Sequence, residues 1–434
     1  MRVHFTNLGC KLNQAEVERL AREMLAAGHQ VVESLDEADL HVVNTCTVTH
    51  LAARDSRKAA GRGARVRPGL RTVVTGCWAT DEPAASARIA GVDLVVPNSE
   101  KHLLLERIHA AFPEDVPSGD ADLPYLPLPV GHTRALVKIE DGCNMRCAFC
   151  IIPSTRGRQR SRPLEEVVAE ARSLADAGFG EIVLTGVQIS AYRDAGGRRL
   201  VDLVRAVLRE TAMPRLRLTS IAPWDLDERL LSLWEDPRLC RHLHLSLQSG
   251  STATLRRMRR PYTAESYGRL LERVRAAVPG VGITTDVIVG FPGESEEEFT
   301  ESLAFTASAR FAKVHAFPFS PREGTAAASL PDQVPPEVRK ERMARLLAAA
   351  EAGATDFRRS HLGSRAMVLW ERPRGGMGHG LTDNYLRVFS EAGAGLSRRL
   401  TEVELVALTE GGVVGKLFLG NLQVECKIRS PFSD

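Results

Sequence analysis

The sequence predicts an α/β protein with three parts: an N-terminal parallel sheet, a central partial (β/α)6 barrel and a small C-terminal β-barrel. β-branched runs alternate with amphipathic helical segments over residues 1–113. Six further strand-like runs alternate with helical segments over residues 130–360. Short strands and Gly-rich turns replace the helices over residues 363–430. The 434 residues are enough for three such domains.

Composition describes an ordinary soluble globular chain, with a formal charge of +3 and 44% hydrophobic residues. The start, "MRVHFTNLGCKLNQAE", lacks the basic and apolar regions of a signal peptide. No stretch reaches the roughly 18 apolar residues of a membrane span. We therefore expect a cytoplasmic protein that does not associate with membranes. In that reducing compartment, the eight cysteines are ligands or catalysts rather than disulfides.

Three cysteines of the N-terminal part occupy the same structural position. Cys10 follows "VHFTNLG", Cys46 follows "LHVVNT" and Cys77 follows "RTVVTG". Each comes at the carboxyl end of a predicted strand, and these ends share one edge of a parallel sheet, where ligands bind. The sequence therefore predicts that the three thiols converge. The alternative is three unrelated buried cysteines.

A Pro-rich stretch at 114–134 is typical of a linker, and the strands of the predicted barrel follow it. Active sites of α/β barrels lie at the carboxyl ends of their strands. The segment "DGCNMRCAFCIIP" follows the first of these strands, so its cysteines are expected at that face. The six predicted strands are 135–142, 181–188, 215–223, 242–250, 282–294 and 313–321.

After a helical connector at 334–360, four short strands are predicted in "SRAMVLWERP", "NYLRVFSE", "TEVELVALTEGG" and "VVGKLFLG". The Gly-rich turns between them indicate a small β-barrel. Modules of this kind often bind nucleic acid, but the charge of this one does not help to decide.

The spacing of Cys143, Cys147 and Cys150 indicates an iron–sulfur cluster. A 4Fe–4S cubane needs one ligand for each iron, so three thiolates leave one iron open to a small molecule. The alternative is a zinc site, which needs a fourth ligand from Cys240, Cys426 or a histidine.

This loop closely resembles the cluster motif of the radical SAM superfamily. With "LGCKLNQAE", "NTCTVTHLAARDSR" and "TGCWAT", the chain resembles the methylthiotransferase family, and most of all the bacterial threonylcarbamoyladenosine tRNA methylthiotransferases. Glu323 departs from the family pattern, in which proline is common. The other motifs that carry the resemblance are "LTGVQIS", "LHLSLQSGS", "LRRMRRPYT", "TTDVIVGFPGE" and "FPFSPREGT".

The resemblance implies two 4Fe–4S clusters, one held by Cys143, Cys147 and Cys150, the other by Cys10, Cys46 and Cys77. Two equivalents of S-adenosylmethionine are used per turnover: one methylates a sulfur on the second cluster and the other supplies a 5′-deoxyadenosyl radical. The product is a 2-methylthio adenosine at position 37 of tRNA, in the anticodon loop. The resemblance further implies a flavodoxin- or ferredoxin-type electron donor, a sulfur donor, a monomer and a C-terminal TRAM-like RNA-binding domain.

Further contacts to S-adenosylmethionine are expected around the barrel face. Phe149 matches an aromatic position that packs near adenine in the superfamily. Gly186 and Gln188 end the second strand, Gln248 and Ser249 the fourth, and Asp286 to Gly290 the fifth. Barrel packing or a tight turn is the alternative for each. His242 and His244, and the cysteines Cys240 and Cys426, are expected to be packed rather than catalytic.

Three basic runs, at 54–71, 156–162 and 255–262, predict contacts with tRNA phosphates. Each run by itself is also typical of a solvated face. Two other functions stay open. One is a sibling methylthiotransferase that acts on isopentenyladenosine 37 of tRNA or on a ribosomal protein aspartate. The other is a metal-containing RNA-binding protein without catalysis.

Overall fold

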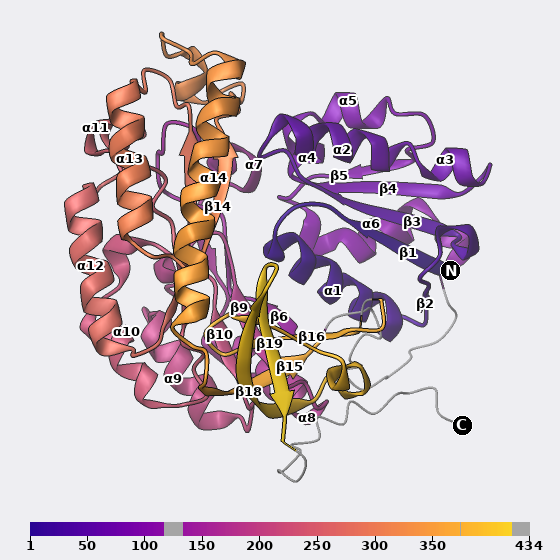
Figure 1. The fold of residues 1–434 in the computed structure, drawn as a ribbon. Coiled ribbons are helices and arrows are strands. Elements are labelled where there is room, and N and C mark those ends of the chain that lie inside the picture. Colours follow the sequence, from indigo (N-terminus) through magenta and orange to yellow (C-terminus); the bar gives the residue numbers. More distant parts are fainter. Residues whose placement is uncertain (117–132, 374, 419–434) are drawn as a thin grey trace.

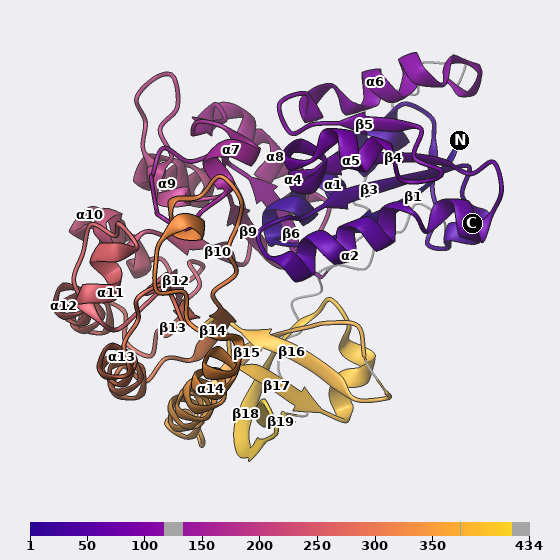
Figure 2. The ribbon, with the colours of Figure 1, turned by 90° about the horizontal axis from the view of Figure 1, so that it is seen from above.

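The computed structural model describes residues 1–116, 133–373 and 375–418. Figures 1 and 2 show an N-terminal α/β unit beside a central unit of strands and helices, with a small β-barrel at the C-terminal end of the chain. No helix among the described residues is both long and apolar enough to cross a membrane. Cys426 and the end of the predicted third domain lie outside the described residues.

The N-terminal unit is a five-stranded parallel sheet in the order β2-β1-β3-β4-β5. This order places the topological switch point, where the order of the strands reverses, between β1 and β3, and open α/β sheets bind ligands there. The short strands β2 and β5 were not predicted. The strands are β1 (Arg2–Asn7), β2 (Gln30–Val31), β3 (Leu40–Thr45), β4 (Arg71–Gly76) and β5 (Leu94–Val96).

Helices cover both faces of this sheet because its central strands are apolar on both sides. Val42 packs with side chains of α1 and α6, whereas its neighbour Val43 packs with α2 and α4 on the opposite face. The helices are α1 (Lys11–Ala26), α2 (His50–Ala60), α3 (Gly63–Val66), α4 (Cys77–Asp81), α5 (Pro83–Ala87) and α6 (Leu104–Ala111).

The central unit contains the six predicted barrel strands as two parallel sheets, β10-β9-β6 and β11-β12-β13-β14. The predicted strand 215–223 is broken at Thr219 into β10 and β11, and this break joins the two sheets into one open barrel. The strands are β6 (Ala135–Lys138), β9 (Ile182–Thr185), β10 (Leu216–Leu218), β11 (Ser220–Ile221), β12 (His242–Leu245), β13 (Gly282–Val289) and β14 (Lys313–Pro318).

Amphipathic helices pack their apolar faces on the barrel strands in the largest core of the described chain. The strands β7 (Glu140–Asp141) and β8 (Arg160–Ser161) pair beside the cysteine loop. The helices are α7 (Ile152–Arg156), α8 (Leu164–Asp176), α9 (Leu200–Glu210), α10 (Glu228–Leu231), α11 (Thr252–Arg257), α12 (Ala264–Ala277), α13 (Glu296–Ser308) and α14 (Pro336–Arg359).

The C-terminal unit is a closed five-stranded barrel in the order β15-β16-β17-β19-β18. Four of its strands were predicted, and β16 was missed because "GHGLT" has two glycines in five residues. The strands are β15 (Arg365–Trp370), β16 (Gly378–Thr382), β17 (Arg387–Ser390), β18 (Leu400–Thr409) and β19 (Gly412–Leu417).

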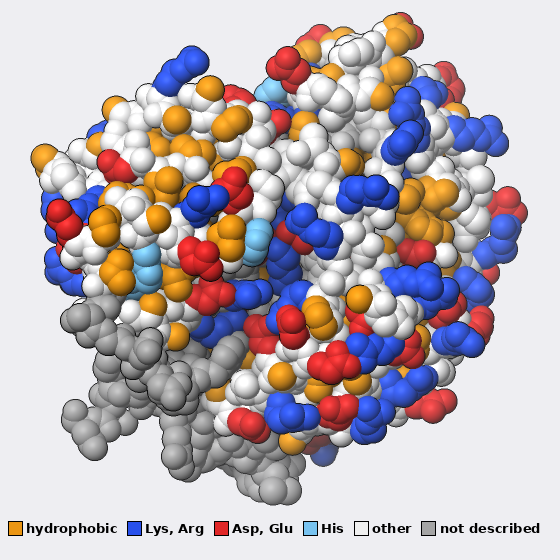
Figure 3. Space-filling view, turned by 180° about the vertical axis from the view of Figure 1, so that it is seen from behind, with side chains coloured by type: hydrophobic (Ala, Val, Ile, Leu, Met, Phe, Trp, Pro, Cys, Tyr) orange, Lys and Arg blue, Asp and Glu red, His pale blue; other side chains and the backbone are white. Residues whose placement is uncertain are grey.

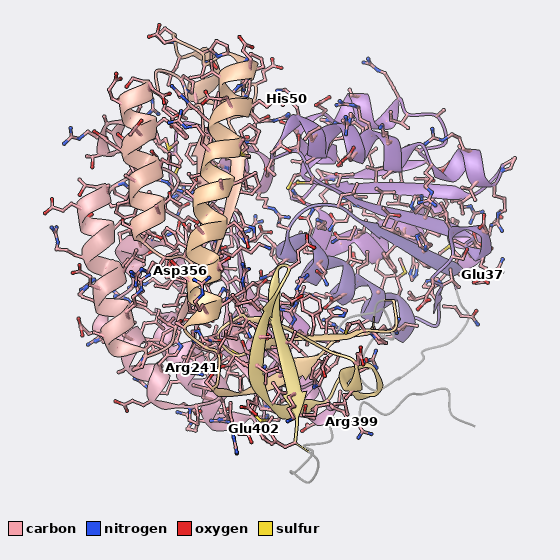
Figure 4. The ribbon with its side chains drawn as sticks, in the orientation of Figure 1. Glu37, His50, Arg241, Asp356, Arg399 and Glu402 are labelled. Atoms are coloured by element: carbon pink, nitrogen blue, oxygen red, sulfur yellow. The ribbon has the colours of Figure 1, made fainter. Side chains whose placement is uncertain are left out.

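This β-barrel packs against the amino ends of the central strands, opposite to the cysteine loop. Arg217 Nη1 donates to Asp383 O at 2.9 Å and its Nε donates to Glu181 at 2.7 Å. Arg241, labelled in Figure 4, pairs with Asp383 at 2.6 Å. Tyr385 stacks on His242 with ring centroids 4.2 Å apart. His242 is thus packed, as expected.

Candidate active site

Glycines with positive φ precede three of the six predicted cluster cysteines. Gly9 has a φ of +101°, and a Cβ on it would lie 3.0 Å from Cys46 Sγ. Gly76 has a φ of +99°, and a Cβ there would lie 2.4 Å from Thr45 O. Gly142 has a φ of +75° and faces Arg158 O. Glycine is therefore needed where each strand turns sharply into its cysteine.

Cys10, Cys46 and Cys77 follow the neighbouring strands β1, β3 and β4, as predicted. Cys10 is exposed, whereas Cys46 and Cys77 are buried. Burial is the main cause that raises the pKa of the Cys46 thiol to about 11; the nearby thiols of Cys77 and Cys10 act in the same direction, and a backbone N–H at Val48 opposes them. The three thiols therefore lie near one another at one edge of the sheet.

Cys143, Cys147 and Cys150 lie between β7 and α7, at the carboxyl end of the first barrel strand. Backbone hydrogen bonds tie this loop to other parts of the barrel. Ala148 N–H donates to Met258 O at 3.0 Å, and Ala148 O accepts from Ala327 N–H at 2.7 Å. The main chain thus anchors the loop at Ala148, between Cys147 and Cys150.

Polar groups of the protein surround the sulfur atoms of this loop. Arg260 Nη1 donates to Cys147 Sγ at 3.4 Å, and Met145 N–H donates to Cys143 Sγ at 3.4 Å. Burial raises the pKa of the Cys150 thiol to about 12 and also raises the pKa of Cys143, while the Arg260 charge opposes both changes. Such thiols release protons when they bind a metal.

Each triad supplies three thiols, the ligand set for three of the four irons of a 4Fe–4S cluster. Among the described residues, no three His, Cys, Asp or Glu side chains are grouped so that they could hold one metal ion. In a cubane each thiolate binds its own iron, so the sulfurs stand apart. N–H donors beside the sulfurs suit anionic ligands, and Asn98 Nδ2 supplies one to Cys77 Sγ at 3.6 Å.

A pocket of about 240 Å³ lies between the cysteine loop and the N-terminal unit. Cys150 lines it from the barrel, and Val48 and Thr49, just after Cys46, line it from the N-terminal side. The backbone N–H of His50, labelled in Figure 4, donates to Ser320 Oγ at 3.2 Å, and Ser320 lines the pocket. The predicted residues Phe149, Gln248 and Asp286 also line this pocket.

The predicted residues Gln188, Gly186 and Ser249 do not line this pocket. Gln188 Oε1 accepts from the Cys143 thiol at 3.7 Å, which places this side chain beside the loop. A Cβ on Gly186 would lie 2.5 Å from Glu140 Oε1, so glycine here makes room for a carboxyl group. Ser249 is buried, and its hydroxyl accepts from Ser251 N–H.

Gly290 directly follows β13, as predicted, whereas Asp286 lies inside this strand. Asp286 lies in the middle of β13, three residues before Val289, and pairs with His244 at 3.1 Å. The strand was predicted to extend to residue 294, but it ends at Val289, where its pairing with β14 ends. Gly290 has a φ of +71° and faces the side chain of Arg339, so it forms a tight turn and does not line the pocket.

A buried polar network that the sequence did not reveal connects the two triads. Asn98 Nδ2, which contacts Cys77, also donates to Thr155 O in α7 at 2.9 Å. Arg156 Nη1 donates to Glu16 Oε1 at 3.0 Å and to Asp141 Oδ1 at 2.9 Å, two residues before Cys143. A cavity of about 400 Å³ lies beside this network, away from the cysteines.

The basic runs are only partly at the surface. Arg156 has a side chain that is 1% exposed, although it opens the run 156–162. In the run 255–262, Arg256 and Arg259 are exposed, whereas Arg257 pairs with Glu298. On the face opposite to that of Figure 1, basic and acidic side chains are interspersed, with several basic ones along its middle (Figure 3).

Family models match two parts of the chain: the radical SAM superfamily over residues 137–306 and Uncharacterized protein family UPF0004 over residues 2–97. The threonylcarbamoyladenosine tRNA methylthiotransferase MtaB of Bacillus subtilis is 35% identical over 93% of this chain and 93% of its own length. The tRNA-2-methylthio-N(6)-dimethylallyladenosine synthase of Syntrophomonas wolfei is 36% identical over 94% of this chain and 96% of its own length.

The chain belongs to the radical SAM tRNA methylthiotransferase family. Members of this family are enzymes that use S-adenosylmethionine and 4Fe–4S clusters. The radical SAM methyltransferase TsrM of Kitasatospora setae shares the fold, with a TM-score of 0.57 and 18% identity over 76% of this chain and 77% of that chain. The radical enzyme OxsB has a TM-score of 0.50 and 13% identity over 82% of this chain and 56% of that chain.

Proposed function

We propose that this chain adds a methylthio group to C2 of N6-threonylcarbamoyladenosine at position 37 of tRNA. The observation that carries the proposal is the pocket between the two cysteine triads, which Cys150 and the segment after Cys46 both border. A substrate in this pocket would lie beside Cys150 and beside the segment that follows Cys46. The Bacillus subtilis relative, similar over nearly its whole length, bears the name of this activity.

Cys143, Cys147 and Cys150 would hold one 4Fe–4S cluster, and Cys10, Cys46 and Cys77 the second. Together with S-adenosylmethionine, these groups supply the radical and the sulfur. The protein binds and orients the reactants and excludes water. Phe149 offers an apolar face, and Gln248 and Asp286 offer polar groups, on the wall of the pocket between the triads.

A second candidate substrate is dimethylallyladenosine in tRNA. Three relatives named for it are 36–38% identical to this chain over 84–94% of its length, so identity alone does not separate the two substrates. The segment "GCKLNQ" around Cys10 favours the threonylcarbamoyl substrate by its resemblance to that subfamily.

The proposal extends to the partners and the organisation of the chain. A flavodoxin or ferredoxin would supply electrons, a separate donor would supply sulfur, and the enzyme would act as a cytoplasmic monomer. The domains would span 1–113, 130–360 and 363–430, the last being a TRAM-like RNA-binding module.

Mass spectrometry of tRNA nucleosides from a strain that lacks the gene, with and without the gene restored, tests this function. We expect the 2-methylthio derivative of threonylcarbamoyladenosine to disappear and to return with the gene. Loss of the 2-methylthio derivative of dimethylallyladenosine (isopentenyladenosine) instead would assign the second substrate. No change in either nucleoside would contradict the proposed activity.

A further inference from the structure

Arg260 is the cationic group closest to the sulfurs of the cysteine loop among the contacts of the described chain. Its Nη1 lies 3.4 Å from Cys147 Sγ, which is within hydrogen-bonding distance for sulfur. The sequence placed Arg260 in a basic run and gave it no role of its own. Its neighbours Arg256 and Arg259 are exposed, so a single run combines surface arginines with one that faces a cysteine.

Aromatic rings hold the Arg260 guanidinium in this position. Its Cζ lies 5.6 Å from the centroid of Phe149 and 5.8 Å from that of Trp224. Trp224 stacks on Tyr262 at 5.8 Å, and the Tyr262 hydroxyl donates to Ser246 O and Leu247 O at 2.8 Å each. The stack therefore connects the arginine to the end of β12.

The Nε side of the Arg260 guanidinium is shielded from water. Its Nε is buried and has no hydrogen-bond partner among the described residues, and the carboxylate of Glu298 pairs with Arg257 instead. Because no carboxylate of the described residues offsets the guanidinium charge, this charge acts on the nearby sulfur, and it acts most strongly where water is excluded. A thiolate that binds iron at Cys147 would thus accept a charge-assisted hydrogen bond.

We propose that Arg260 sets the reduction potential of the cluster held by Cys143, Cys147 and Cys150. One-electron reduction takes an electron from an external donor, such as dithionite, and adds one negative charge to the cluster and its thiolates, with no proton needed. A fixed cation beside a ligand sulfur favours the more negative state. Arg260 therefore makes the cluster easier to reduce. This inference rests on the proposed cluster site.

The test is a redox titration followed by electron paramagnetic resonance, without S-adenosylmethionine. The background is the full chain carrying C10A, C46A and C77A, so that a single cluster titrates. We expect R260Q to lower the ratio of reduced to oxidised cluster at least tenfold at a fixed potential, which corresponds to a midpoint about 59 mV more negative. R260K keeps the charge but not the planar fork, so it should recover only part of this shift.

R256Q is the matched control, because it removes the same charge from an exposed position on the same segment; its midpoint should equal that of the parent. Should R260Q fail to hold iron, R260K decides, since its midpoint is also expected to be more negative. An unchanged midpoint in R260Q or, in that case, R260K overturns the proposal. If the midpoint is unchanged and a separate binding measurement shows a lower affinity for S-adenosylmethionine, Arg260 binds the cofactor instead. A parent without iron would refute the cluster site itself.

Discussion

Arg156 provides the sharpest test of how the two units that carry the cysteine triads are held together. Its side chain is 1% exposed, and its partners Glu16 and Asp141 are 7% and 10% exposed. The variant R156M would remove ion pairs of 3.0 and 2.9 Å to these carboxylates. Breaking a buried pair from one side costs about 3–5 kcal/mol. Because Lys138 still contacts both carboxylates at 2.7 Å, we expect about 3 kcal/mol, the lower end of that range.

Hydrogen–deuterium exchange measures this loss locally. A reduction of about 3 kcal/mol in the free energy of opening makes exchange roughly a hundredfold faster, and we expect this in α1 and α7. Exchange in α12, far from the network, should stay unchanged. R160M, which removes an exposed arginine nearby, should shift stability by less than about 0.5 kcal/mol. Exchange in α1 and α7 of R156M within about threefold of the wild type would refute the reasoning.

Two further predictions concern tRNA binding and pH. Neutralising the exposed Arg256 and Arg259 should weaken tRNA binding and lower the slope of log affinity against log salt by about 2. R257Q should change the slope less, because Arg257 pairs with Glu298. Equal slopes in all variants would contradict phosphate contacts. Burial raises the pKa of Glu140 to about 7. The folded protein then keeps a proton that the unfolded chain has lost above its ordinary pKa of about 4.3, so stability falls as pH rises through this window. The free energy of unfolding of E140Q, relative to that of the wild type, should therefore rise by up to about 3 kcal/mol between pH 4 and pH 8, measured on the cluster-free protein. The same difference between the two proteins at both pH values would contradict this origin.

The positions of the six cysteines could be predicted because the signals are local. Each N-terminal cysteine ends a β-branched run, and "LGC", "TGC" and "DGC" carry the glycine that the turn requires. The barrel strands were predicted for the same reason, since strand and helix periodicities alternate along the chain. Boundaries were predicted less well: the strand predicted over 282–294 ends at Val289, because its pairing with β14 stops there and Gly290 turns the chain with a φ of +71°.

The environment of the cysteines could not be predicted because its partners are distant in sequence. Arg156 looks like part of a surface run until Glu16, which lies 140 positions away, is packed against it. Arg260 and Cys147 are likewise 113 positions apart. A run of arginines indicates charge but not which members become buried, since burial depends on how the units pack.

The proposed function gives the two triads separate tasks, and one reaction tests them. A C10A/C46A/C77A triple variant, reduced with dithionite and supplied with S-adenosylmethionine and tRNA, is analysed by chromatography for 5′-deoxyadenosine and 2-methylthio nucleoside. We expect about four irons per chain, half of the full content, with 5′-deoxyadenosine formed and no methylthio nucleoside. Full iron content, or methylthio nucleoside from this variant, would contradict a sulfur-carrying cluster at Cys10, Cys46 and Cys77.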